Sequence, residues 1–149
     1  MIDISFILPT FNRKKYLMRA IESCLNISKG KIRSYVIVID GFSTDGAWEM
    51  VNEIYKNNEF VKLIQFPKVG FQRTAFYGVS LVKTEYATFM YNDDIISPFF
   101  GEYLNDMVVK GEKYFMGLGY SYPINEIFPF RRVKPMPTSK FKLIKTYFG

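Results

Sequence analysis

Two kinds of apolar segment alternate along this chain. Short continuous apolar runs are typical of strands that are buried on both faces of a parallel sheet. Four such runs predict four strands, at residues 4–8, 35–39, 61–66 and 86–91. The segments between these runs carry apolar residues at helical spacing, so strands and helices alternate as they do in sheets covered by helices.

The helical pattern is clearest in the first two intervening segments. The apolar stripe of the first is formed by Leu17, Ala20, Ile21, Cys24 and Leu25. The stripe of the second is formed by Ala47, Met50, Val51 and Ile54. Ser43, Thr44 and Asp45 precede this second stripe and predict a helix start with hydroxyl caps and an acid in the first turn.

The predicted fold is therefore α/β, a mostly parallel sheet flanked by helices. Further helices are expected at residues 70–82 and 98–109, and a fifth strand at residues 113–118. The pattern fades after Tyr120, where prolines interrupt a basic and aromatic stretch. We expect one domain over residues 1–120 and a tail over residues 121–149.

Charge and composition narrow the class of function. The 149 residues carry a net charge of +6, and no acid follows Glu126, so the excess positive charge lies in the tail. The chain has no histidine and one cysteine, which excludes His-based catalysis, a Cys/His zinc cluster and an intrachain disulfide. No basic leader opens the chain and no apolar run is long enough to span a membrane, so we expect a cytoplasmic protein in a reducing compartment.

Polar residues follow three of the predicted strands at the point where each strand ends. Pro9, Thr10, Phe11 and Asn12 follow the first strand, residues 40–45 (Asp-Gly-Phe-Ser-Thr-Asp) the second, and residues 92–94 (Asn-Asp-Asp) the fourth. Each has a plain alternative as a turn or a helix cap. The carboxyl ends of parallel strands share one edge of a sheet, where α/β proteins bind ligands, so we expect these groups to converge on one site. Two adjacent carboxylates repel each other unless a cation neutralises them, which favours a divalent metal there.

These motifs together resemble the nucleotide-binding half of the family 2 inverting glycosyltransferases, which have the Rossmann-like GT-A fold. The resemblance rests on residues 4–12, residues 36–46, the glycines at 70 and 78, and residues 85–94, and it covers roughly residues 3 to 100. It implies that residues 1–120 bind a nucleotide diphosphate sugar. It also implies metal-dependent transfer of that sugar to a glycan or other hydroxyl acceptor, with inversion.

The resemblance also implies roles for particular residues. The nucleotide would be bound by Pro9, Thr10, Asn12, Asp40, Arg73, Asn92 and Asp93, and Mn²⁺ or Mg²⁺ by Asp93 and Asp94. Asp40 would accept a hydrogen bond from the base, which favours uridine because uracil carries an imide N–H.

The chain departs from the usual family motifs at several positions. Gly41 stands where a second acid is usual, and Phe42 where a glycine is usual. Ala75 fills a position that is often arginine, and Arg73 either replaces that arginine or is a surface charge. Asn92 stands in place of the first aspartate of the metal motif and removes one negative charge, which weakens metal binding.

No general base is recognised in this sequence. Inverting transfer needs an acid that deprotonates the acceptor, and the family supplies it from the acceptor half, which is incomplete here. Glu112 and Glu126 are the only weak candidates. The alternatives are a piece of a longer enzyme or a non-catalytic module that binds the donor or a partner.

The tail, with aromatic residues among its basic ones, fits three kinds of partner. It fits the rest of an acceptor half, a protein partner, or the inner face of a membrane as a peripheral contact. If its apolar residues belong to a missing acceptor half, self-association of this chain is expected. No nucleic-acid-binding motif is present, and neither a glycine-rich dinucleotide fingerprint nor a P-loop follows the first strand.

Overall fold

The computed structural model describes residues 1–27 and 31–110, and within them strands and helices alternate as predicted. The order is β1 (Ile2–Thr10), α1 (Lys14–Leu25), β2 (Ile32–Asp40), α2 (Ala47–Tyr55), β3 (Val61–Gln65), α3 (Phe71–Ser80), β4 (Tyr86–Phe89) and α4 (Phe100–Val109). The predicted fifth strand, the domain boundary after residue 120 and the tail lie outside the described residues.

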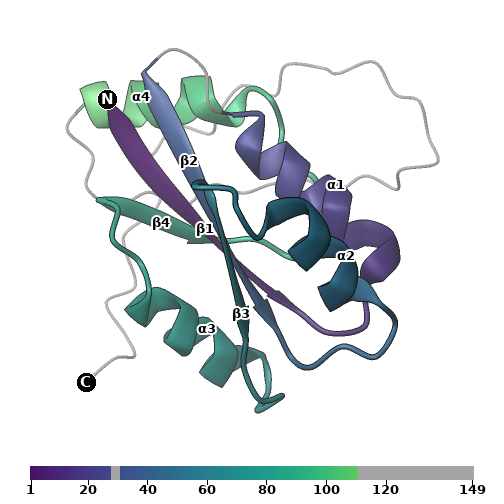
Figure 1. Ribbon diagram of the computed structural model, residues 1–149. Coiled ribbons are helices and arrows are strands. Elements are labelled where there is room, and N and C mark those ends of the chain that lie inside the picture. The colour runs from purple at the N-terminus through teal and green to yellow at the C-terminus, as the bar shows by residue number, and fades with distance from the viewer. Residues whose placement is uncertain (28–30, 111–149) are drawn as a thin grey trace. The chain divides into compact units, whose positions relative to one another are not determined.

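The four strands form one parallel sheet in the order β3-β2-β1-β4 (Figure 1). The register pairs Thr10 at the end of β1 with Asp40 at the end of β2, and Asp40 in turn with Gln65 at the end of β3. Three strands therefore end at the same level, and the loops that follow them start from one edge of the sheet.

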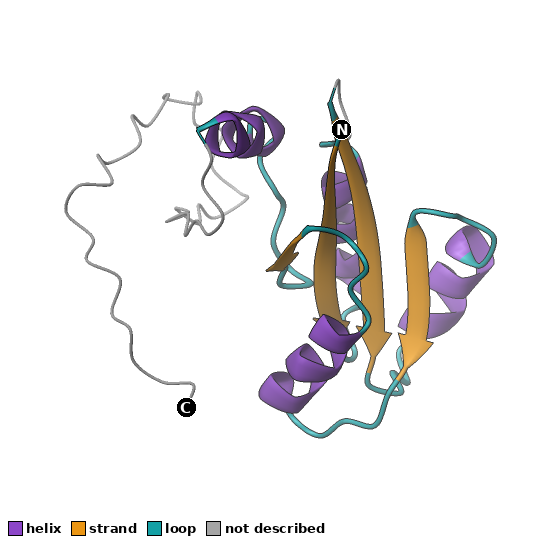
Figure 2. Ribbon diagram, turned by 90° about the vertical axis from the view of Figure 1, so that its left-hand side faces the viewer, coloured by secondary structure: helices purple, strands orange, loops and turns teal. Residues whose placement is uncertain are grey.

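Helices cover both faces of this sheet (Figure 2). Residues of α1, α2 and α4 pack on one face in the larger hydrophobic core, which includes the fully buried Phe6, Leu17 and Leu104. Residues of α3 pack on the opposite face against the smaller cluster of Ile7, Ile37 and Ile39. The central strand β1 is therefore buried on both faces, as its continuous apolar run predicts.

Helix α3 lies unusually close to the sheet at Gly78. A Cβ atom placed on Gly78 would lie 2.3 Å from Cγ2 of Ile7 and 2.8 Å from Cδ1 of Ile39, far inside normal contact distance. Glycine is therefore favoured at this point, because any side chain would force the helix or the strands to shift.

Two local expectations are wrong. Helix α2 starts from Gly46, at φ 80°, and neither Ser43 nor Thr44 caps it, although Asp45 accepts the N–H of Ala47 at 3.0 Å. Ser43 is unavailable as a cap because its hydroxyl is bound elsewhere. Ile54 is 54% exposed, since the buried stripe of α2 runs through Ala47, Val51 and Tyr55 instead.

The fourth strand is also shorter and more exposed than its apolar run predicts. It ends at Phe89 instead of residue 91, and Phe89 is 47% exposed. Its neighbour in the described sheet is β1 alone, so only one of its edges is paired there.

In the described part of the chain, no helix has both the length and the apolar character needed to cross a membrane.

Candidate functional site

The structure brings the polar strand ends together at the carboxyl edge of the sheet. Asn92, in the turn after β4, donates its side-chain amide to the carbonyl oxygen of Pro9 at 3.2 Å and to Oγ1 of Thr10 at 3.3 Å. Gly41, directly after β2, donates its N–H to the carbonyl oxygen of Thr10 at 2.9 Å. The loops after β1, β2 and β4 are therefore joined by direct hydrogen bonds.

Asp40 is the most buried acid of this edge. The residue is 1% exposed, and both carboxylate oxygens accept hydrogen bonds. Oδ2 accepts the N–H of Ser43 at 2.9 Å, and Oδ1 accepts the hydroxyl of Ser43. The amide of Gln65 reaches Oδ2 at 3.5 Å. The carboxylate of Asp40 is thus turned into the protein, where it holds the start of its own loop.

Ser43 links this buried carboxylate to the loop after β1. Its Oγ accepts the N–H of Asn12 at 2.8 Å, and Oδ1 of Asn12 accepts the N–H of Thr44 at 2.8 Å. We call these contacts the Asp40–Ser43–Asn12 network. A further bond joins the same two loops, because Asp45 accepts the N–H of Lys14 at 2.8 Å.

Two residues of these loops have a left-handed backbone although they are not glycine. Asn12 has φ 51° and Phe42 has φ 61°. Such a conformation costs about 1 to 2 kcal/mol for most L-residues, such as Phe42, whereas asparagine adopts it more readily. The network supplies hydrogen bonds at both places, since Asn12 belongs to it and Phe42 precedes Ser43.

Phe11 is part of this edge and was not among the predicted site residues, although it stands inside the motif after β1. Its ring lies close over Gly41, where a Cβ would be 3.2 Å from Cδ2 of Phe11. The ammonium group of Lys68, in the loop after β3, lies 3.8 Å from the centre of the ring. Lys68 gave no signal in the sequence, because only the folded chain brings its loop to Phe11.

Asp93 and Asp94 are exposed in the turn after β4. Within residues 1–27 and 31–110, no hydrogen bond or ion pair occupies either carboxylate, and no group of three or more His, Cys, Asp or Glu is placed to hold a metal. Two carboxylates fit a hard divalent cation whose remaining ligands come from phosphate and water, which is the usual manner of Mg²⁺. The residues present therefore fit a shared site rather than a cage built by the protein alone.

Arg73 and Ala75, which the sequence analysis considered for the position that is often arginine, lie on different faces of helix α3. Arg73 is exposed in the first turn, and Ala75 is 6% exposed and faces the sheet. Because α3 follows a parallel strand, its first turn lies at the carboxyl edge. Arg73 is thus near the edge of the sheet where the candidate site lies, whereas Ala75 is part of the core.

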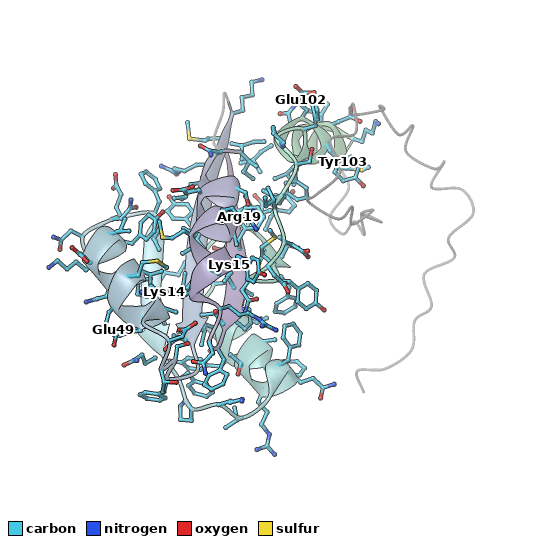
Figure 3. All side chains as sticks on the ribbon, turned by 90° about the vertical axis from the view of Figure 1, so that its right-hand side faces the viewer. Lys14, Lys15, Arg19, Glu49, Glu102 and Tyr103 are labelled. Atoms are coloured by element: carbon cyan, nitrogen blue, oxygen red, sulfur yellow. The ribbon has the colours of Figure 1, made fainter. Side chains whose placement is uncertain are left out.

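Basic residues also line α1, which starts at Lys14, two residues after Asn12. Lys14, Lys15 and Arg19 follow one another along this helix (Figure 3). The first turn of α1 contains no acid, and the amino end of a helix carries partial positive charge. The side chains of Lys14, Lys15 and Arg19 therefore add positive charge beside the edge, where the carboxylate of Asp45 already occupies the N–H of Lys14.

A separate hollow of about 270 Å³ lies at the other end of the sheet, between the start of β2 and α4. Lys31, Ile32, Glu102 and Asn105 are among the residues that line it. None of the predicted site residues lies there. The two candidate general bases, Glu112 and Glu126, lie outside the described residues.

Comparison with known proteins identifies relatives over most of this chain. The sequence model of the family described as "Glycosyl transferase family 2" matches residues 5–147. An uncharacterized glycosyltransferase of Haemophilus influenzae is 37% identical over 95 residues, which are 63% of this chain and 37% of that protein. The abequosyltransferase RfbV of Salmonella typhimurium is 32% identical over 97 residues, which are 63% of this chain and 29% of that protein.

Solved glycosyltransferase structures share the fold. Residues 1–349 of S. aureus TarS, in complex with UDP-GlcNAc, match with a TM-score of 0.64 and 24% identity over 73% of this chain and 32% of that one. The mannosyltransferase PcManGT of Pyrobaculum calidifontis, in complex with GDP-Man and Mn²⁺, matches with a TM-score of 0.61 and 15% identity over 70% of this chain and 32% of that one. The predicted GT-A fold is thus confirmed for its amino-terminal part, and the chain spans about a third of the length of these proteins.

Proposed function

Because the chain belongs to glycosyl transferase family 2, we propose that it is the donor-binding part of a glycosyltransferase that uses a nucleotide diphosphate sugar and a divalent metal. One observation carries the proposal. Asp93 and Asp94 present two exposed carboxylates in a turn that Asn92 ties to the end of β1, beside the loops that the Asp40–Ser43–Asn12 network holds.

The diphosphate of the donor is proposed to lie between Asp93 and Asp94 and the positive start of α1. Mn²⁺ or Mg²⁺ held by the two carboxylates supplies positive charge to a diphosphate leaving group. The cations of α1 attract the same group electrostatically, and Arg73 is the proposed further contact from α3. The proposed metal is consistent with PcManGT, whose structure is a complex with GDP-Man and Mn²⁺.

The nucleoside is proposed to lie by the loop of Pro9, Thr10, Phe11 and Asn12. The ring of Phe11, with the ammonium group of Lys68 over it, is part of this loop. We propose a uridine-linked donor as the first to test, since TarS is described in complex with UDP-GlcNAc and with UDP. The inverting course of transfer and the cytoplasmic location stay predictions.

The acceptor side of the reaction needs a base that the described residues do not provide in a recognisable place. An acceptor hydroxyl attacks the anomeric carbon in line with the leaving diphosphate and loses its proton to a carboxylate. Glu112 and Glu126 stay the proposed candidates. Slow hydrolysis of the donor sugar by this chain would support the enzyme, and binding without turnover would support the donor-binding module.

Calorimetric titration tests the donor site directly. We expect one or more of UDP, GDP, CDP and dTDP to bind in the presence of Mn²⁺, and we expect Asp93→Asn and Asp94→Asn each to weaken that binding at least tenfold. Each substitution keeps the size of the side chain and removes one charged ligand of the metal. Asp106→Asn is the matched control, since Asp106 is an exposed aspartate on α4 that pairs with Lys110. Normal binding by both metal-motif variants would refute the proposed site.

A further inference from the structure

We propose that Asp40 is a positioning residue of the donor site, which acts on the nucleotide through Ser43 and Asn12 and makes no contact with the base. The inference rests on the proposed function and deepens it, because it assigns how the base is held. It differs from the sequence-based expectation that Asp40 itself reads an imide N–H.

Both oxygens of the Asp40 carboxylate already accept hydrogen bonds from within the protein. The N–H and the hydroxyl of Ser43 occupy one oxygen each, and the amide of Gln65 approaches one of them as well. With 1% of the residue exposed, a base could reach the carboxylate only if the loop opened. Opening would break the two hydrogen bonds that Ser43 donates to the carboxylate, which costs free energy.

The network transmits the position of this carboxylate to the loop that flanks the proposed nucleoside site. Ser43 binds the N–H of Asn12, and Asn12 binds the N–H of Thr44. Asn12 has a left-handed backbone, and Phe11 directly precedes it. Losing the bond that Asn12 donates to Ser43 would therefore loosen Asn12 and, with it, the position of Phe11.

No other carboxylate of the loop after β2 is free to replace Asp40 as a reader of the base. Gly41 has no side chain, and the ring of Phe11 fills the space beside it. Both oxygens of Asp45 accept backbone N–H groups, from Lys14 and Ala47. The carboxylates of this loop thus stabilise its conformation. A substitution at Asp40 is therefore expected to weaken the binding of nucleotides with different bases to the same extent.

A comparison of UDP with CDP separates the two roles, because cytosine lacks the imide N–H of uracil. We expect Asp40→Asn to weaken the Mn²⁺-dependent binding of UDP and of CDP by the same factor, about tenfold, since each nucleotide depends on the same loop. We expect Ser43→Ala to do the same, and the double variant to bind no more weakly than the weaker single variant, because the residues act in series. Ser43→Thr keeps the hydroxyl and is expected to retain most of the binding.

Amide hydrogen exchange gives a second readout that needs no nucleotide and survives if Asp40→Asn folds poorly. In Ser43→Ala, exchange at Asn12 is expected to speed up more than tenfold relative to Val38 in the centre of β2. Unchanged exchange at Asn12 would overturn the proposal, and so would a loss of UDP binding that spares CDP or an additive double variant. If the unmodified chain binds no nucleotide with Mn²⁺, both this inference and the proposed function fail, whereas selective loss of UDP binding would overturn only the inference.

Discussion

Replacing Gly78 with alanine tests the closest packing contact of the fold. The added Cβ would lie 2.3 Å from Cγ2 of Ile7 and 2.8 Å from Cδ1 of Ile39, whereas carbon atoms in good contact lie about 3.5 to 4.0 Å apart. Neither isoleucine can yield towards solvent, since Ile7 is 1% and Ile39 0% exposed. The helix must therefore move away from the sheet by more than about 1 Å, or β1 and β2 must shift.

The expected loss of stability follows from two opposing terms. Overpacking of this kind costs about 1 to 3 kcal/mol, and alanine gains about 1 kcal/mol over glycine inside a helix. The clash involves two β-branched side chains fixed in neighbouring strands, so we expect an overpacking cost in the upper part of that range. The net expectation is that Gly78→Ala lowers the free energy of unfolding by about 1 to 2 kcal/mol.

Urea unfolding, followed through the fluorescence of the single Trp48, measures this change. Gln72→Ala is the control for an alanine outside the contact, because Gln72 is exposed on the same helix, and it is expected to change stability by less than about 0.5 kcal/mol. Ile7→Ala removes the nearest clashing atom, so the double variant with Gly78→Ala should lose less than the sum of the single losses. A midpoint for Gly78→Ala at or above that of the unmodified chain would show that α3 does not approach the sheet as described.

Two further predictions concern titrating groups far from the site. Burial raises the pKa of the Cys24 thiol to about 12, so the unfolded chain loses the thiol proton at a lower pH than the folded chain does. Above about pH 9, the free energy of unfolding should therefore fall by about 1.4 kcal/mol per pH unit more than in Cys24→Ala. Parallel pH profiles of the two proteins would contradict this. The hydrogen bond from Arg33 holds the pKa of Asp3 below its ordinary value, so this pair stabilises the fold above the unfolded pKa of Asp3 and loses that effect as the pH falls. An NMR titration should find the pKa of Asp3 higher in Arg33→Gln, and an unchanged value would mean that the pair does not form in solution.

The elements of the fold could be predicted because most of them are decided by local patterns. The run at residues 35–39 is continuous and apolar, and β2 is buried on both faces there. The errors arose where tertiary contacts decide. Phe89 and Ile54 are as apolar as their buried neighbours, but β4 is paired on one edge of the described sheet and Ile54 lies beyond the stripe of α2 that faces the core.

The site could be predicted as a place, but less well as a set of roles. Parallel strands fix which edge collects Thr10, Asp40 and Asn92, and the register puts the first two side by side. The direction in which Asp40 points depends on Ser43 folding back over it, which no spacing rule reveals. The contact of Lys68 with Phe11 likewise needs two loops that lie 57 residues apart, by the difference of their numbers, to meet at the same edge.

In the loop after β2, Phe42 adopts a left-handed backbone conformation that usually requires glycine. Phe42 stands where the family motif usually has glycine, and yet its φ is 61°. Burial of its ring does not hold it there, since Phe42 is 52% exposed. A strained backbone persists where neighbouring contacts hold it in place. Here Ser43, the residue after Phe42, is held by the two hydrogen bonds that it donates to Asp40. The hydrogen bonds to Asp40 thus help to hold a conformation that glycine would adopt without steric cost, which favours a positioning role over a contact with the base.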